Sequence, residues 1–317
     1  MTESATVAGP VRKEKKRLPF LLEVIARLVR EKPLGTVGGV IVLIFFVVGI
    51  LAPWLAPYHY TYQDLNAVLQ APSSRFLLGT DNLGRDLFSR IIYGARISMI
   101  VGLAVPAIST VMHLFIGGVS GYFGGKIDLL IQRFVDTVMC FPGLVLMLTV
   151  VAIVGPGLTQ LVLVLGILGG LGGGNRVTRS VVIGIKQNVY VEAAKAIGSS
   201  HWRIMVKHIL PNIMPILIVS FTMGMGGAIL AESTLSFLGF GIPPPFPSWG
   251  GMLSGQARRY MLDAPWMAIW PGVCLALVVY GMNMLGDGLR DILDPRLRGG
   301  LGRYGNSKAK KKLNVVS

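Results

Sequence analysis

The sequence predicts an all-α membrane protein with six transmembrane helices, and three observations carry this prediction. Hydrophobic residues make up 52% of the 317 residues and charged residues only 14%, which is too apolar for an ordinary soluble domain. Six long stretches contain no Asp, Glu, Lys or Arg, and a bilayer span needs about 20 predominantly apolar residues. The Lys and Arg residues gather in alternate connecting segments, as they do in proteins that cross a membrane repeatedly.

The longest uncharged stretch has to fold back on itself. Thr137 to Asn175 would form a helix of roughly 58 Å, almost twice the hydrocarbon thickness of about 30 Å. Gly155-Pro156-Gly157 supplies the turn, because glycine permits unusual backbone angles and proline removes a backbone donor. The spans are therefore predicted at about 34–53, 95–118, 133–154, 158–180, 212–238 and 265–286.

The basic residues set the orientation, because they are retained on the cytoplasmic side of a membrane. With the N-terminus inside, 24 of the 30 Lys and Arg residues are cytoplasmic: 8 up to Lys32, 2 near Lys126, 6 from Arg176 to Lys207 and 8 from Arg290 onwards. We therefore expect both termini to be cytoplasmic. The net charge of +15 then reflects contact with anionic membrane lipid, and no nucleic-acid partner is expected.

The spans divide the chain into four parts. These are a cytoplasmic tail (1–33), the first helix with an outer segment (34–94), a five-helix core (95–286) and a second cytoplasmic tail (287–317). Six glycines between Gly166 and Gly174 predict close helix packing in the core. A phosphate-binding loop would instead need Lys-Ser or Lys-Thr after the glycines, where Asn175-Arg176 stands.

The largest cytoplasmic loop lies in the core, at 187–211, and offers a place for a soluble partner. Its pattern predicts a helix from Tyr190 to Ile197, a break at Gly198-Ser199-Ser200 and a second helix that ends near Pro211. The apolar residues of the second helix recur at helical spacing and predict one face, formed by Trp202, Met205, Val206 and Ile209.

The loop resembles the EAA loop of bacterial ABC importer permeases in Glu192-Ala193-Ala194, Gly198 and Ile209-Leu210-Pro211. The resemblance covers about residues 34 to 298 and is closest to the C-type subunit of the dipeptide, oligopeptide and nickel branch. It rests further on Gly79-Thr80-Asp81, Gly84-Arg85-Asp86, Ala231 to Gly239, Pro247 to Gly250, Ala264-Pro265-Trp266 and Leu285 to Arg296.

The resemblance implies a non-catalytic subunit with the type I importer permease fold in the bacterial inner membrane. It implies a homologous permease as partner, two ATPase subunits that carry ATP and Mg, and an extracytoplasmic substrate-binding protein. No cofactor and no metal are expected on this chain. The cargo implied is a di- or oligopeptide, with nickel or another small solute as the alternative, because selectivity in this branch rests largely on the binding protein.

The loop residues expected to dock on the ATPase have chemistry that suits close contact. Small residues let a partner approach closely, Glu192 favours the positive end of the first helix, and Trp202 offers a large anchor. The alternative is an amphipathic helix that merely lies on lipid headgroups. The expected docking residues are Glu192, Ala193, Ala194, Gly198, Trp202, His208, Leu210 and Pro211.

Two further sets of residues are candidates for contact with substrate or binding protein. Glu232 is the only acidic residue of the fifth span, and a charge in a membrane suggests function, here in the translocation path. It could instead pair with a neighbouring helix. On the outer side, the candidates for contact with the binding protein are Asp81, Arg85, Asp86 and Trp249, whose alternative role is to cap the bundle.

Two other functional classes remain as alternatives to an ATP-driven importer. An ion-driven secondary transporter would not require the loop from Glu192 to Pro211. A membrane-embedded hydrolase needs a nucleophile with a base, or a metal cluster. His113 is the only histidine predicted in a span, and no carboxylate or cysteine lies at helical spacing from it, which disfavours this class.

Overall fold

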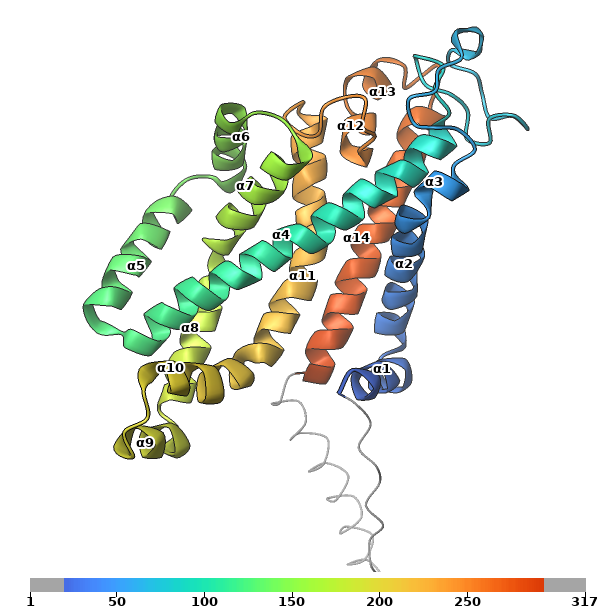
Figure 1. The fold of residues 1–317 in the computed structure, drawn as a ribbon. Coiled ribbons are helices and arrows are strands. Elements are labelled where there is room, and N and C mark those ends of the chain that lie inside the picture. The colour runs from blue at the N-terminus through green and yellow to red at the C-terminus, as the bar shows by residue number, and fades with distance from the viewer. Residues whose placement is uncertain (1–19, 294–317) are drawn as a thin grey trace, which may run out of the picture.

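The computed structural model describes residues 20–293, which form a bundle of long helices (Figure 1). The helices at the start of the chain are α1 (Phe20–Glu31), α2 (Pro33–Ile50), α3 (Ala52–Leu55), η1 (Leu65–Ala67) and α4 (Leu87–Phe123). They are followed by α5 (Gly125–Met139), α6 (Gly143–Val154), α7 (Leu158–Gly170), α8 (Gly173–Lys186) and α9 (Val189–Ala196). The last are α10 (His201–Ile204), η2 (Met205–Ile209), α11 (Leu210–Phe237), α12 (Trp249–Leu253), α13 (Gly255–Arg259) and α14 (Trp266–Leu293).

Four helices are each long and apolar enough to cross a membrane. They are α2, α4, α14 and the continuous helix from His201 to Phe237, which includes α11. Two more spans result if each of two broken helix pairs counts as one: α5 with α6, bent by 89°, and α7 with α8, bent by 44°. The all-α fold with up to six spans agrees with the sequence prediction.

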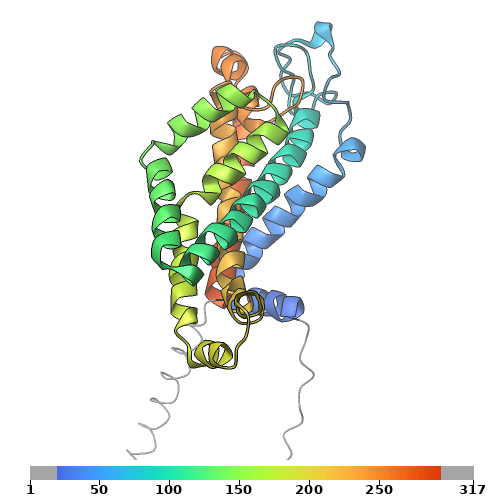
Figure 2. The same cartoon turned by 60° about the vertical axis from the view of Figure 1, so that its left-hand side comes forward.

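The predicted third span, 133–154, is not one continuous helix but is broken between α5 and α6. Helix α5 ends at Met139, the chain turns through Cys140 to Pro142, and α6 leaves in a new direction (Figure 2). Pro142 explains the break, because proline disfavours helical geometry in the residue before it and has no N–H to donate. The predicted turn between the third and fourth spans is confirmed, with Gly155 and Gly157 at φ values of 96° and 155°.

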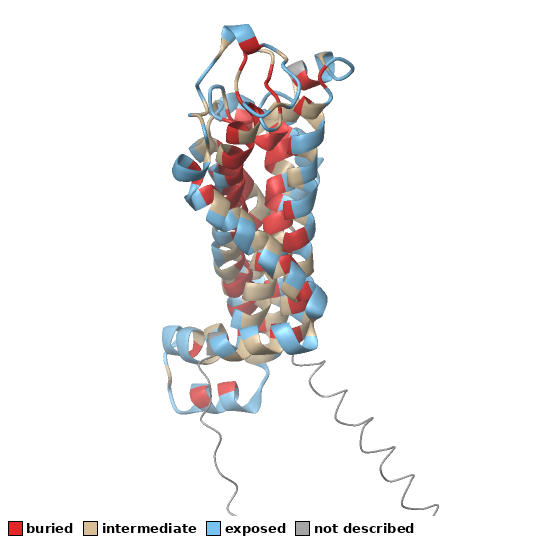
Figure 3. Cartoon of the chain, turned by 90° about the vertical axis from the view of Figure 1, so that its right-hand side faces the viewer, coloured by how far each residue is buried: buried red, intermediate tan, exposed pale blue. Residues whose placement is uncertain are grey.

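The bundle is centred on α4, which packs against α2, α7, α8 and α11, while α14 packs against α2 and α11. Close packing of α2 on α14 depends on glycine. A Cβ atom at Gly38 would lie 2.5 Å from the carbonyl oxygen of Gly281. The three buried residues of α2 are all glycines. Large apolar residues such as Leu43 and Leu130 are 59% and 71% exposed, as residues that face lipid are. Figure 3 shows exposed and intermediate residues along the outside of the long helices.

Both ends of the described chain lie at the same end of the bundle as α9 and α10 (Figure 1). This is the cytoplasmic end by the distribution of basic residues. The predicted N-terminal tail contains helix α1, and the predicted C-terminal tail begins with the last turns of α14. Lys32 Nζ lies 2.5 Å from Asp291 Oδ2 and joins these two elements. Residues 1–19 and 294–317 of the predicted tails lie outside the described residues.

Candidate functional site

Helices α9 and α10 form a helical hairpin that projects beyond the cytoplasmic end of the bundle (Figures 1 and 2). The chain reverses at Gly198, whose φ of +77° lies in the left-handed region that glycine adopts without strain. The Ser200 hydroxyl then caps α10 by accepting a hydrogen bond from the Arg203 N–H at 3.3 Å. The predicted pair of helices with a break at Gly198 is confirmed.

The inner face of the hairpin is fixed to the bundle by apolar packing. A buried cluster combines hairpin residues with residues of α4, α8 and α11, and its members are Tyr122, Val182, Val191, Ala194, Ile204, Ile209, Ile213 and Leu217. One polar contact adds to this attachment, because the Tyr122 hydroxyl of α4 lies 2.8 Å from His201 Nδ1. Lys186 Nζ of α8 donates to the Tyr122 carbonyl oxygen at 2.5 Å and so joins two of the supporting helices to each other. The hairpin is therefore held against three helices.

The outer face of the hairpin presents large apolar side chains. Val189, Ile197 and Trp202 are 81%, 82% and 76% exposed. The single apolar face predicted for the second helix is wrong, because Ile209 is buried whereas Trp202 and Val206 are exposed. The expected docking residues are exposed at Glu192, Ala193, Gly198, Trp202 and Pro211, intermediate at His208 and Leu210, and buried at Ala194.

The sequence predicted that the second helix ends near Pro211. In the structure this helix continues into α11. In a regular α-helix the Pro211 ring would clash with the carbonyl four residues earlier. The five residues of η2, which form a π-helix, widen the turn directly before α11 and relieve this conflict. The Asn212 side chain also donates to the His208 carbonyl oxygen at 2.6 Å. The second half of the loop, from His201, and the fifth span are thus one continuous helix.

At the outer end, Asp81 and Asp86 organise the segment that leads into α4. Asp81 accepts hydrogen bonds from the backbone N–H groups of Leu83 and Arg85, at 2.8 and 3.0 Å, and from Arg85 Nε at 2.6 Å. Asp86 caps α4 by accepting from the Ser89 N–H at 2.8 Å. The two acidic residues are only 4% and 3% exposed, so both bind other parts of their own chain.

Trp249 is also inside this outer cap and is fully buried. Its indole N–H donates to the Ile91 carbonyl oxygen at 3.1 Å, and its ring meets Phe45 edge-on with centroids 5.5 Å apart. Asp81, Asp86 and Trp249 are therefore all buried in the outer cap and bound to other parts of their own chain. Contact with a binding protein stays a prediction.

Glu232, near the outer end of α11, is fully buried among serines. Ser236 Oγ donates to it at 2.6 Å and Ser233 Oγ at 3.2 Å, and no ion pair in the described part of the chain involves it. These serines are not among the site residues predicted from the sequence, although Ser236 stands four residues after Glu232, one helical turn away. A role of Glu232 in the translocation path stays a prediction.

Comparison with known proteins identifies the family. Residues 113–299 match the family described as binding-protein-dependent transport system inner membrane component. Residues 21–72 match the N-terminal transmembrane domain of oligopeptide transport permease C.

Curated relatives cover most of the chain. A dipeptide transport system permease protein of Alkalihalophilus pseudofirmus is 40% identical over 85% of this chain and 88% of its own length. A glutathione transport system permease protein of Pectobacterium atrosepticum is 37% identical over 91% of this chain and 95% of its own length. A probable D,D-dipeptide transport system permease protein of Escherichia coli is 38% identical over 86% of this chain and 91% of its own length. The chain therefore belongs to the family of binding-protein-dependent transport system inner membrane components, the permease subunits of ABC importers.

Proposed function

We propose that this chain is the permease of a peptide importer and that the α9–α10 hairpin docks on an ATPase subunit. The cargo class follows from the relatives, whose names give dipeptides, D,D-dipeptides and glutathione, all of them peptides. The partners in this proposal are a homologous permease, two ATPase subunits that bind ATP and Mg²⁺, and an extracytoplasmic binding protein. The assembly lies in the bacterial cytoplasmic membrane.

The observation that carries the docking proposal is the exposed apolar tip of the hairpin. Trp202 is 76% exposed although the inner face of the same hairpin is tightly packed. Large aromatic anchors of this kind dominate the energy of protein interfaces. Gly198 has no atom within 4 Å of the place a Cβ would occupy, so a partner can approach the backbone at the turn.

The test compares two tryptophans of similar exposure at opposite ends of the bundle. Trp202→Ala is expected to reduce both co-purification of the ATPase and ATP-driven peptide uptake at least tenfold. Trp54→Ala is the control, because Trp54 is 79% exposed but lies at the outer end, beyond α2. Equal uptake by the two variants, or uptake that survives ATP depletion, would contradict the proposal.

A further inference from the structure

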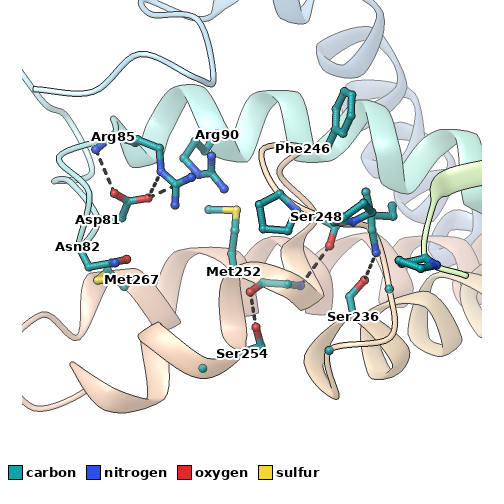
Figure 4. A pocket seen from close by; sticks show the side chains of 18 of the residues that line it. Asp81, Asn82, Arg85, Arg90, Ser236, Phe246, Ser248, Met252, Ser254 and Met267 are labelled. Carbon is teal, nitrogen blue, oxygen red and sulfur yellow. Dashed lines mark hydrogen bonds and ion pairs between the residues drawn. The ribbon is translucent and has the colours of Figure 1, made fainter. Parts of the chain in front are cut away.

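A cavity of about 380 Å³ lies at the outer end of the bundle, away from the ATPase-docking hairpin (Figure 4). Its walls come from the segment around Asp81, the first turn of α4, the proline-rich loop after α11, and α12. Pockets that hold small ligands have volumes of about 300–1,000 Å³ and combine apolar walls with a few polar groups. This cavity has both properties, because Ile242, Phe246 and Met252 line it together with charged residues and serines.

One side of the cavity has an excess of positive charge. Arg85 and Arg90 both line it, and Asp81 is the single acidic residue among the lining residues. Asp81 Oδ2 lies 2.6 Å from Arg85 Nε and 3.7 Å from Arg90 Nε. Arg90 also donates to the carbonyl oxygens of Tyr60 and Pro245, at 3.2 and 3.5 Å. The single carboxylate of Asp81 is therefore shared by the guanidinium groups of Arg85 and Arg90.

Arg85 has donors left for a ligand. Its side-chain hydrogen bond with Asp81 uses Nε, and within residues 20–293 no hydrogen bond uses its two terminal nitrogens. The terminal nitrogens of a guanidinium form a planar fork that fits the two oxygens of a carboxylate. This side of the cavity is therefore suited to an anionic carboxylate.

The other side of the cavity is suited to a cation. Ser236 and Ser248 line it, and Figure 4 shows them across the pocket from Asp81 and Arg85, with Met252 between. Ser236 Oγ donates a hydrogen bond to Glu232 Oε1. Glu232 is the fully buried acidic residue of α11, and it has no ion-pair partner in the described structure. Serine oxygens backed by a carboxylate favour a cationic group such as an ammonium.

We propose that this cavity receives a small zwitterionic peptide on its way from the binding protein into the membrane. The peptide's C-terminal carboxylate binds the terminal nitrogens of Arg85, and its N-terminal ammonium lies at Ser236 and Ser248, next to Glu232. This proposal rests on the peptide import proposed above and adds a binding site on the permease itself. According to this proposal, the site binds only peptides whose N-terminal ammonium and C-terminal carboxylate are both unblocked.

The test measures protection of a cysteine in the cavity of the assembled transporter. Cys140 and Cys274 are the two cysteines of the chain and are first replaced by serine. Asn82→Cys then places a thiol in the cavity lining. Alanyl-alanine is expected to slow maleimide labelling of this thiol at least threefold, whereas its C-terminal amide and its N-acetyl derivative have no effect. Leu83→Cys is the matched control, because Leu83 is exposed beside the cavity but does not line it, and its labelling is expected to be unchanged.

Two variants test the two sides of the cavity. Arg85→Gln is expected to abolish protection by alanyl-alanine, and Glu232→Gln to weaken it at least threefold. Arg75→Gln is the control, because Arg75 belongs to the same outer segment and pairs with Asp64 at 2.8 Å but does not line the cavity. Protection that persists in Arg85→Gln, or equal protection by the amide, would overturn the proposal.

Failure of this proposal can be told apart from failure of the proposed function. If the parent transporter imports alanyl-alanine but the peptide never protects Asn82→Cys, the cavity proposal is wrong and peptide import stands. If the parent transporter imports another solute and no peptide, the proposed function itself is wrong. The comparison of peptide analogues needs no change at Arg85, so the cavity proposal stays testable even where Arg85→Gln does not fold.

Discussion

Arg179 in α8 donates two parallel hydrogen bonds to Asp128 in α5, one from Nε to Oδ1 at 2.6 Å and one from Nη2 to Oδ2. Ser120 of α4 donates to the same carboxylate. Three helices thus meet at one acidic side chain, which is only 16% exposed. The pair holds α5, which lies at the edge of the bundle, close to α4 and α8 (Figure 1).

Asp128→Asn is expected to lower the free energy of unfolding by about 1–3 kcal/mol, because a charge-assisted, forked pair is lost where water is partly excluded. Arg133→Gln is the control, since Arg133 is 74% exposed and 3.8 Å from Asp136, and such surface pairs contribute about 0–1 kcal/mol. Thermal unfolding of the purified protein in detergent measures both. An equal shift in melting temperature for the two variants would contradict the importance given to the Arg179 pair.

Gly174→Ala is expected to destabilise the packing of α8 on α4. The new Cβ would lie 2.2 Å from Cε1 of the buried His113 ring, and overpacking of this kind costs about 1–3 kcal/mol. Gly173→Ala is the matched control, because nothing lies within 4 Å of its Cβ position. Melting temperatures should fall for Gly174→Ala alone; a fall of the same size for Gly173→Ala, where the new methyl group meets nothing, would show that the His113 contact is not the cause.

Gly38→Ala is expected to separate α2 from α14. Its Cβ would lie 2.5 Å from the Gly281 carbonyl oxygen, and a backbone atom cannot move aside as a flexible side chain can. The neighbouring substitution, Gly39→Ala, meets only a Leu285 methyl group at 3.5 Å and should be tolerated. Cysteine cross-linking between the two helices measures the separation, and unchanged cross-linking in Gly38→Ala would contradict the close approach.

Gly198→Ala is expected to loosen the hairpin locally, because a side chain at a φ of +77° costs about 1–2 kcal/mol. The open surroundings of Gly198 exclude a steric clash as the cause. Gly184→Ala is the control: Gly184 lies inside α8, equally open, and alanine there is expected to stabilise by about 0.5–1 kcal/mol. Hydrogen exchange over residues 187–211 should accelerate in Gly198→Ala only, and unchanged exchange there would rule out strain at the turn.

The sequence predicts well those features that depend on neighbouring residues. Stretches without charge predict the spans, and the glycines around Pro156 predict the turn between α6 and α7. The 89° break at Pro142 is missed because absence of charge says nothing about the direction of a helix. The signal for this break in the sequence is Pro142 itself.

Features that depend on distant partners are beyond sequence reasoning. Trp249 binds a carbonyl 158 residues away, at Ile91, so its burial has no local signal. The same holds for Asp128, whose Arg179 partner is 51 residues along the chain. The outer motif around Asp81 and Arg85 is visible in the sequence, but the cavity that it lines together with the loop after α11 joins residues more than 150 positions apart and has no local signal.

The unbroken helix from His201 to Phe237 has a mechanical consequence. Its 37 residues follow a path of roughly 55 Å, so the hairpin is joined to Glu232 and Ser236 without an intervening loop. The π-helical turn at η2 is the place along this path where the helix geometry is irregular and can yield. In the proposed function, movement of the hairpin on an ATPase subunit would then reach the cavity at the other end of the bundle through α11, with η2 as the point that yields.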